Sequence, residues 1–177
     1  LFRSFEIMAI PFFILAGNFL THGGVARRMI DFATSMVGHF RGGLGMSSVF
    51  ACALFAAVSG SSPATVVAIG SIMLPAMVKA GYPKSFGVGV ISSAGGLGIL
   101  IPPSIVMVMY AVSTNSSIGA LFMAGVIPGL LLAVFLGVTT WYVAHKGNYP
   151  RERRYTWAER GKAFTKSIWG LQIGRAH

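Results

Sequence analysis

Long uncharged runs, separated by short basic segments, dominate the sequence. Residues 7–26 contain no Asp, Glu, Lys or Arg, and at about 1.5 Å per helical residue such a run can cross a hydrocarbon core about 30 Å thick. Residues 25–40 instead mix two arginines and an aspartate with apolar positions, a pattern typical of a helix in the membrane interface. Residues 1–41 are therefore predicted to hold a first membrane span and an interfacial helix.

The uncharged run over residues 42–78 is interrupted by a Ser-Gly-Ser-Ser-Pro sequence at residues 59–63. A single helix would have to tolerate a strong break there. Two helices fit better, with Ser62 as the N-cap of the second and Pro63 at its first position, where the missing N–H costs nothing. Residues 42–84 are predicted to form a helical hairpin. Two full spans and a re-entrant hairpin both remain open, and the uncharged tip favours the re-entrant form.

Residues 85–145 carry no charged side chain and are long enough for two spans, divided by a Thr-Asn-Ser-Ser sequence at residues 114–117. The first span is interrupted at the glycine-rich residues 95–98 and at the Pro-Pro-Ser of residues 102–104, where helical hydrogen bonding cannot continue smoothly. The second runs over residues 118–144. The pattern predicts a broken helix and a following span.

The composition points to a membrane protein. Of 177 residues, 54% are apolar and 10% are charged, against roughly 25% charged residues in ordinary soluble domains. The mean hydropathy is +0.72, and the 23 glycines suit closely packed membrane helices. The predicted fold class is an all-α, multi-span integral membrane protein.

The net charge of +10 arises from 14 basic and 4 acidic residues. The basic residues flank apolar runs or gather in a tail at residues 146–171, which argues against nucleic-acid binding and predicts a cytoplasmic amphipathic connector. With the N-terminus outside, Lys79, Lys84 and this tail fall on the cytoplasmic face, and the loop at Asn115 falls outside. The single cysteine, Cys52, cannot form an intrachain disulfide.

The two ends of the chain lead us to expect a piece of a longer protein. The sequence begins at Leu1 without Met and without the charged start of a signal peptide. Residues 172–177 include Ile-Gly-Arg-Ala-His, which one reading frame of a common sequencing adapter would encode. We expect the natural protein to continue beyond Leu171 with a different sequence.

The two helix breaks predict a binding site. Unpaired backbone groups are costly in lipid, so non-helical backbone at membrane depth persists only inside protein or beside a water-filled cavity. Discontinuous helices direct N-terminal partial positive charge at anions, while freed carbonyls and Ser or Thr hydroxyls bind small cations. Because the predicted spans carry no charged residue, a coupling ion would be bound by neutral oxygens.

Two alternatives to transport make different predictions. In a membrane scaffold the glycines would serve helix packing alone, and Ser61→Ala or Ser62→Ala would leave uptake unchanged. In an intramembrane hydrolase one serine would react with a serine-directed probe. The serines of residues 59–62 have no base near them in the sequence, and the four histidines lie at span ends or in the tail, so no enzymatic activity is predicted.

Four motifs occur in order along the chain. They are Ala-Ile-Pro-Phe-Phe-Ile-Leu-Ala-Gly at residues 9–17, Ser-Gly-Ser-Ser-Pro-Ala-Thr at 59–65, Gly-Ile-Leu-Ile-Pro-Pro-Ser at 98–104, and Gly-Ala-Leu-Phe-Met-Ala-Gly-Val-Ile-Pro-Gly at 119–129. Together they resemble the large permease subunit of TRAP transporters, the DctM-like family. The core at residues 92–104 is most similar to the C4-dicarboxylate branch.

The resemblance implies a secondary transporter of the bacterial or archaeal inner membrane that uses a sodium gradient, without a cofactor. It implies carboxylate solutes as substrates, delivered by a periplasmic solute-binding protein, and a small membrane permease subunit as partner. It also implies inverted repeats, each with a re-entrant hairpin and a broken helix, that work as an elevator; this chain corresponds to the first repeat. The principal alternative is a sodium-coupled anion symporter of the same superfamily without a binding protein.

The resemblance also assigns candidate site residues. Sodium is implied to bind at Gly60, Ser61 and Ser62 with backbone carbonyls near Gly98. The unwound stretch of the broken helix is implied to meet the hairpin tip beside the substrate. The implied substrate- and ion-binding residues are Ser59, Gly60, Ser61, Ser62, Thr65, Gly98, Pro102, Pro103 and Ser104.

Overall fold

The structure, a computed structural model, describes residues 11, 15, 24–40, 42–147 and 149, and within these residues it contains helices and turns but no strand. The predicted all-helical fold is confirmed for this part of the chain. Most of the first predicted span, the connector and residues 172–177 lie outside it. The helices are α2 (Val25–Val37), α3 (Gly43–Ser59), α4 (Ser62–Lys79), α5 (Lys84–Gly95), α6 (Leu97–Leu100), α7 (Ile105–Thr114) and α8 (Ile118–Lys146).

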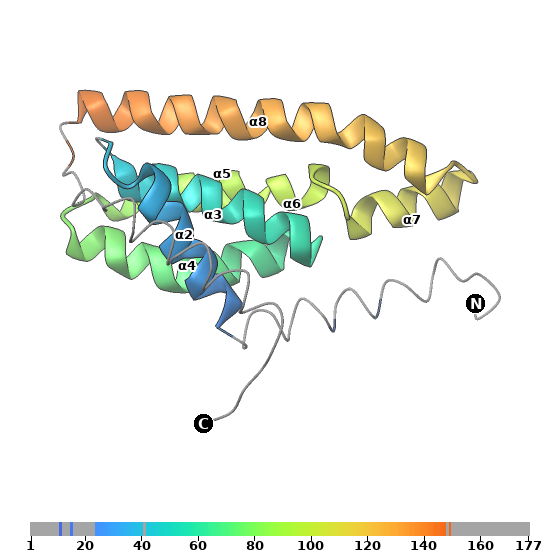
Figure 1. The fold of residues 1–177 in the computed structure, drawn as a ribbon, viewed down its shortest axis with the longest axis horizontal. Coiled ribbons are helices and arrows are strands. Elements are labelled where there is room, and N and C mark those ends of the chain that lie inside the picture. The colour runs from blue at the N-terminus through green and yellow to red at the C-terminus, as the bar shows by residue number, and fades with distance from the viewer. Residues whose placement is uncertain (1–10, 12–14, 16–23, 41, 148, 150–177) are drawn as a thin grey trace.

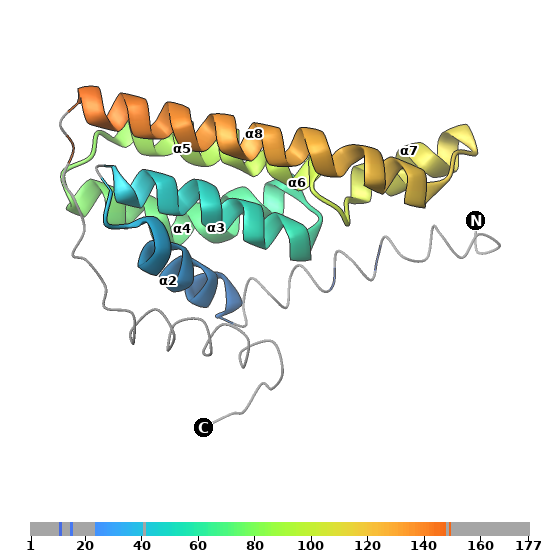
Figure 2. The ribbon, with the colours of Figure 1, turned by 45° about the horizontal axis from the view of Figure 1, so that its top comes forward.

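The helices α3, α4, α5 and α8 lie side by side, with α2 packed across α3 and α4 (Figures 1 and 2). The helix α8 extends along the whole bundle, while α5, α6 and α7 follow one another beneath it (Figure 1). The helix α3 ends, and α4 begins, near the junction of α6 and α7 (Figure 1). The end of the hairpin therefore lies beside the predicted break in the neighbouring helix.

The core of the bundle is made mostly of small and flexible side chains. These fill the space between α2, α3, α4 and α5, where helices approach closely. The fully buried apolar residues include Ala33, Ala51, Cys52, Phe55, Ile69, Met73, Met77 and Ala94.

The outer face of α8 is apolar and exposed. Met123, Ile127 and Phe135 are 76%, 68% and 65% exposed, respectively, on a helix that contains no charged residue before its last turn. A helix that is apolar all round needs an apolar surrounding. The helices α4 and α8 are long and apolar enough to cross a membrane, and α5–α6 with α7 would make a third span if the pair, bent by 41°, is one.

The start of α4 differs by one residue from the prediction. Ser62 and Pro63 occupy the first two helical positions, and Ser61 is the N-cap, with an extended backbone and no side-chain cap. The prediction that Ser62 caps the helix with Pro63 at its first position was wrong. The reason is that the chain already turns at Gly60, the C-cap of α3 at φ 62° and ψ 13°, so Ser61 comes directly before α4 as its N-cap.

Candidate functional site

The hairpin tip is a turn of two residues between α3 and α4. The amide of Gly60 donates to the carbonyl of Ala56 at 2.9 Å and so closes the last turn of α3. The left-handed conformation of Gly60 carries no Cβ penalty and turns the chain sharply. Ser61 then extends the chain into the first turn of α4.

A closed set of hydrogen bonds shapes the tip. The hydroxyl of Thr65 donates to the carbonyl of Ser61 at 2.8 Å, which uses its single hydrogen. At the 3.2 Å contact between the two hydroxyls, Ser59 must therefore be the donor to Thr65. The amide of Ser61 donates in turn to the Ser59 hydroxyl at 3.5 Å. Ser59 and Thr65 are both fully buried, and their hydroxyl hydrogens stay inside the tip.

The break between α6 and α7 follows directly from two prolines. Pro102 and Pro103 stand four residues after Gly98 and Ile99, so the carbonyls of those two residues lose the amide donors that an α-helix would supply. The helix resumes after Ser104, whose hydroxyl accepts from an amide in the first turn of α7. The two helical parts are bent by 41° at this break.

The tip of α3–α4 docks directly against this break. The amide of Ile105 donates to the carbonyl of Gly60 at 3.1 Å. A Cβ at Gly60 would lie 2.5 Å from the Pro103 carbonyl oxygen, and one at Gly98 would lie 2.9 Å from the Ser62 amide nitrogen. Both positions therefore require glycine. We name this contact the tip–break junction.

The structure brings the predicted candidates together at the tip–break junction. Within the residues that the structure describes, no group of three His, Cys, Asp or Glu could hold a metal ion. The oxygen atoms at the junction belong to backbone carbonyls and to serine and threonine hydroxyls. The junction comprises Ser59, Gly60, Ser61, Ser62, Thr65, Gly98, Pro102, Pro103 and Ser104.

Helix ends with partial positive charge and helix ends with partial negative charge both lie at the junction. The N-termini of α4 and α7 and the C-termini of α3 and α6 meet there. The hydroxyls of Ser61 and Ser62 are half-buried and make no hydrogen bond to the described part of the chain. Ser104 is 1% exposed. Within residues 42–147 the charged side chains are three lysines, and they stand at the end of α4, the start of α5 and the end of α8, which are not the helix ends that form the junction.

Two glycines of α8 lie against the break, although neither stands among the predicted site residues. A Cβ at Gly125 would lie 2.7 Å from the carbonyl oxygen of Leu100. One at Gly129 would lie 3.2 Å from the side chain of Ile101. Their spacing of four residues is the small-xxx-small signal of close helix contact, and it could have predicted this contact.

Comparisons with known proteins identify the family. The family model described as tripartite ATP-independent periplasmic transporter, DctM component, matches residues 2–174. The C4-dicarboxylate TRAP transporter large permease protein DctM of Rhodobacter capsulatus is 64% identical over 185 aligned residues, which cover 97% of this chain and 42% of that protein. The protein of the same name from Pseudomonas aeruginosa is 56% identical, with 97% and 40% covered. The ectoine/5-hydroxyectoine TRAP transporter large permease protein UehC of Ruegeria pomeroyi is 44% identical, with 96% and 40% covered.

The chain thus spans about two fifths of the length of these relatives. The match over residues 2–174 confirms the resemblance carried by the four motifs. With the apolar helices α4 and α8, it makes this chain part of a multi-pass membrane protein of a transporter family. The chain belongs to the DctM component family of tripartite ATP-independent periplasmic transporters.

Proposed function

We propose that this chain is part of the large permease of a TRAP transporter that imports carboxylate solutes, C4-dicarboxylates in particular, by sodium symport. The tip–break junction is the observation that carries the proposal, because it places freed carbonyls, half-buried hydroxyls and helix ends at one point. The two DctM relatives named for C4-dicarboxylates support the substrate class. UehC, named for ectoine and 5-hydroxyectoine, supplies the alternative substrate.

Sodium would bind as a co-transported substrate through neutral oxygens. The carbonyls of Gly98 and Ile99 have no helical amide donor, and the hydroxyls of Ser61 and Ser62 lie at the end of the facing hairpin. Unwound carbonyls and helix C-termini are the groups that bind coupling ions in broken-helix transporters. Ser59 and Thr65 hydrogen-bond to each other and to the Ser61 backbone, so they hold the shape of the tip on which these ligands lie.

A substrate carboxylate would be attracted by the helix N-termini of α4 and α7. Each carries backbone amides and partial positive charge, which favour an anion. The buried hydroxyl of Ser104 lies at the start of α7 and can donate to a carboxylate oxygen, since its hydrogen is not used by the described residues. Basic side chains are not needed at such a site.

The lengths of the helices support a re-entrant hairpin. The 17 residues of α3 and the 18 residues of α4 rise about 26 and 27 Å, against about 43 Å for the 29 residues of α8. The tip meets the start of α7, and the ten residues of α7 continue beyond it. A hairpin that stops at this level enters the membrane and returns. The elevator arrangement implied by the family resemblance would then move this hairpin against a scaffold.

The proposed partners are a small membrane permease subunit and a periplasmic solute-binding protein, with the inner membrane as location. The lysines of residues 42–147 lie at one end of the bundle, and a basic end faces the cytoplasm under the positive-inside rule. The tip–break junction would then be reached from the opposite, periplasmic side.

The test is uptake of radiolabelled succinate by the full-length transporter in vesicles, with its small subunit and binding protein and with or without a sodium gradient. We expect Ser62→Ala to raise the sodium concentration for half-maximal uptake about three-fold or more, as expected for one lost polar contact. Ser71→Ala is the matched control, because Ser71 lies on the same helix and its hydroxyl bonds the Ala68 carbonyl away from the tip.

The other outcomes separate the alternatives. Sodium-driven uptake without the binding protein would favour the symporter. Sodium-dependent uptake of ectoine but not of succinate would keep the family and replace the substrate. Unchanged uptake in both Ser61→Ala and Ser62→Ala would overturn the role of the junction and favour a scaffold.

A further inference from the structure

The outward face of α8 is a continuous band of large apolar side chains, each between 52% and 76% exposed. We name it the α8 band, and it consists of Met123, Ile127, Leu130, Leu131, Val134, Phe135 and Val138. The opposite face of the same helix carries small residues that pack on the bundle, such as Gly125, Gly129 and Thr140. Small residues are typical of contacts between membrane helices. The α8 band lacks this feature of a helix interface.

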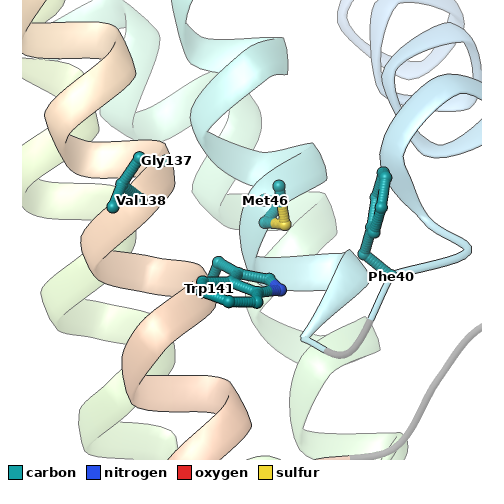
Figure 3. A pocket seen from close by; sticks show the side chains of 5 residues that line it. All are labelled: Phe40, Met46, Gly137, Val138 and Trp141. Atoms are coloured by element: carbon teal, nitrogen blue, oxygen red, sulfur yellow. The ribbon is translucent and has the colours of Figure 1, made fainter.

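Aromatic residues mark both ends of the α8 band. Trp141 and Tyr142 are 41% and 61% exposed at its C-terminal end, where Trp141 and Phe40 line one apolar pocket (Figure 3). Tyr110, 58% exposed, lies at the other end, because α7 packs antiparallel to α8 and brings it near the level of Phe122. From Phe122 to Trp141 the helix rises about 29 Å, close to the thickness of a hydrocarbon core. Trp and Tyr are enriched at its two boundaries.

The distribution of polar and charged residues fits the same boundaries. Residues 122–141 carry no charge, and the five polar residues 113–117, all exposed, lie beyond one end. Lys146 lies beyond the other end. The two lysines that flank the α4–α5 turn lie there as well, since Tyr149 after α8 contacts Tyr82 of that turn with ring centroids 5.1 Å apart. A basic end complements the negative surface potential of a cytoplasmic leaflet.

We propose that the α8 band contacts the acyl chains of the bilayer directly, with the hydrocarbon core extending from the level of Phe122 to that of Trp141. The centre of the bilayer then lies near Leu131. Gly125 and Gly129, which contact the break, lie about 5 and 10 Å inside the boundary at Phe122. The tip–break junction is therefore in the half of the bilayer away from the lysines. This placement requires only that α8 crosses a bilayer, and it does not depend on sodium or dicarboxylate transport.

The test measures the surroundings of the α8 band by EPR spectroscopy. The full-length permease, with its native cysteines replaced by Ala, is reconstituted with its small subunit in phosphatidylcholine vesicles. A nitroxide is attached to one introduced cysteine at a time, at Met123, Ile127, Leu131, Phe135 or Val138. Oxygen concentrates in hydrocarbon and a neutral nickel complex in water, and both collide with the nitroxide. We expect the ratio of oxygen to nickel collisions to be highest at Leu131 and several-fold lower at Met123 and Val138.

Two controls define the ends of the scale. Leu136→Cys is the matched control, because Leu136 adjoins Phe135 at nearly the same depth but packs against the core. Its label should collide less often with oxygen than the label at Phe135. Ser116→Cys lies in the exposed turn before α8, and its label should collide most often with the nickel complex. Size-exclusion chromatography of each labelled complex identifies variants that fail to fold.

Three results would overturn the proposal. Low collision rates with both reagents along the whole α8 band would show that protein covers it, whether from the rest of the permease or from the small subunit. Frequent nickel collisions at Leu131 would show that the band faces water. A maximum of the oxygen-to-nickel ratio at Ile127 would place the tip–break junction at the bilayer centre and contradict the depth inferred for it.

Discussion

Two glycine contacts at opposite ends of α3 look alike in the sequence and differ in structure. At the tip–break junction, Cβ atoms at Gly60 and Gly98 would meet backbone atoms of the facing segment, 2.5 and 2.9 Å away. At the start of α3, which we name the α3–α8 crossing, Cβ atoms at Gly42 and Gly45 would meet side chains of Ala144 and Thr140 instead, with Thr140 Cγ2 2.8 Å from Gly45.

The difference separates a site from ordinary helix contact. At the α3–α8 crossing two intact helices lie side by side, so their backbone groups remain paired within each helix. At the tip–break junction helix ends meet, and carbonyls such as those of Gly98 and Ile99 have no helical donor. The membrane-scaffold alternative, in which the glycines serve helix packing alone, therefore describes the α3–α8 crossing well. It does not account for the freed backbone groups at the junction.

The largest effect is expected for Gly60→Ala. An alanine would need a left-handed backbone and would press its Cβ against the Pro103 carbonyl, at a combined cost of about 3 kcal/mol or more. We expect sodium-driven succinate uptake by the full-length transporter to be lost, with a lower midpoint of thermal unfolding for the purified permease. No neighbouring side-chain substitution should rescue it, because the obstacle is backbone.

Gly81→Ala serves as the control for Gly60→Ala. Gly81 also has a left-handed φ, of 90°, but nothing lies within 4 Å of its Cβ position. It should therefore show the conformational cost alone and retain sodium-dependent uptake. Equal damage to uptake in both variants would mean that backbone conformation, and not the close approach to Pro103, explains Gly60.

A smaller effect on stability is expected for Gly98→Ala, where the backbone φ is ordinary. The new Cβ would push the tip away from the break at the Ser62 amide, at a cost of about 1–3 kcal/mol. We expect the sodium concentration for half-maximal uptake to rise about ten-fold, equivalent to 1.4 kcal/mol of lost ion binding. Gly89→Ala, with open space at its Cβ, should leave the value unchanged. If Gly98→Ala leaves the sodium dependence unchanged, the coupling ion does not bind at the contact between Gly98 and the tip.

Local sequence rules predicted much of this arrangement. Uncharged runs bounded by lysines predict helices, Ser-Gly-Ser-Ser-Pro predicts a turn, and Pro102 with Pro103 predicts a break, because each depends on residues close together in the chain. The family followed from the same motifs. The N-cap of α4 was misplaced because it depends on where Gly60 enters the left-handed region, which the serines on either side do not determine.

Contacts between distant residues could not be predicted in this way. The bond from the Ile105 amide to the Gly60 carbonyl joins segments 45 residues apart, and it requires the mutual placement of two helices. The sequence also could not predict which serine hydroxyls of the tip are hydrogen-bonded within it. Ser59 and Ser62 both stand among the implied binding residues, and only the geometry shows that the hydroxyl of Ser59 bonds to Thr65 while that of Ser62 has no partner in the described chain.

Thr65→Val should affect the shape of the tip without removing a proposed ion ligand. It deletes the bond to the Ser61 carbonyl and leaves the buried Ser59 hydroxyl without its acceptor, a loss of about 1–3 kcal/mol. The thermal unfolding midpoint of the full-length permease should fall. Thr65→Ser keeps the hydroxyl and should stay near the wild-type midpoint. A Thr65→Val midpoint equal to that of the wild type would show that these hydrogen bonds do not stabilise the tip.

The smallest effect is expected at the α3–α8 crossing, and it can be rescued. Gly45→Ala would press its Cβ against Thr140 Cγ2 and should destabilise the permease by about 1 kcal/mol, with sodium dependence unchanged. Thr140→Ser removes the obstructing methyl group, so the double variant should recover part of the loss as a coupling of about 0.5–1 kcal/mol in a double-mutant cycle of thermal unfolding. Additive losses would place the strain at Phe86, the other neighbour of Gly45 at 3.2 Å. A changed sodium dependence would contradict the comparison itself, because two intact helices in side-chain contact would then influence ion binding as the joined helix ends do.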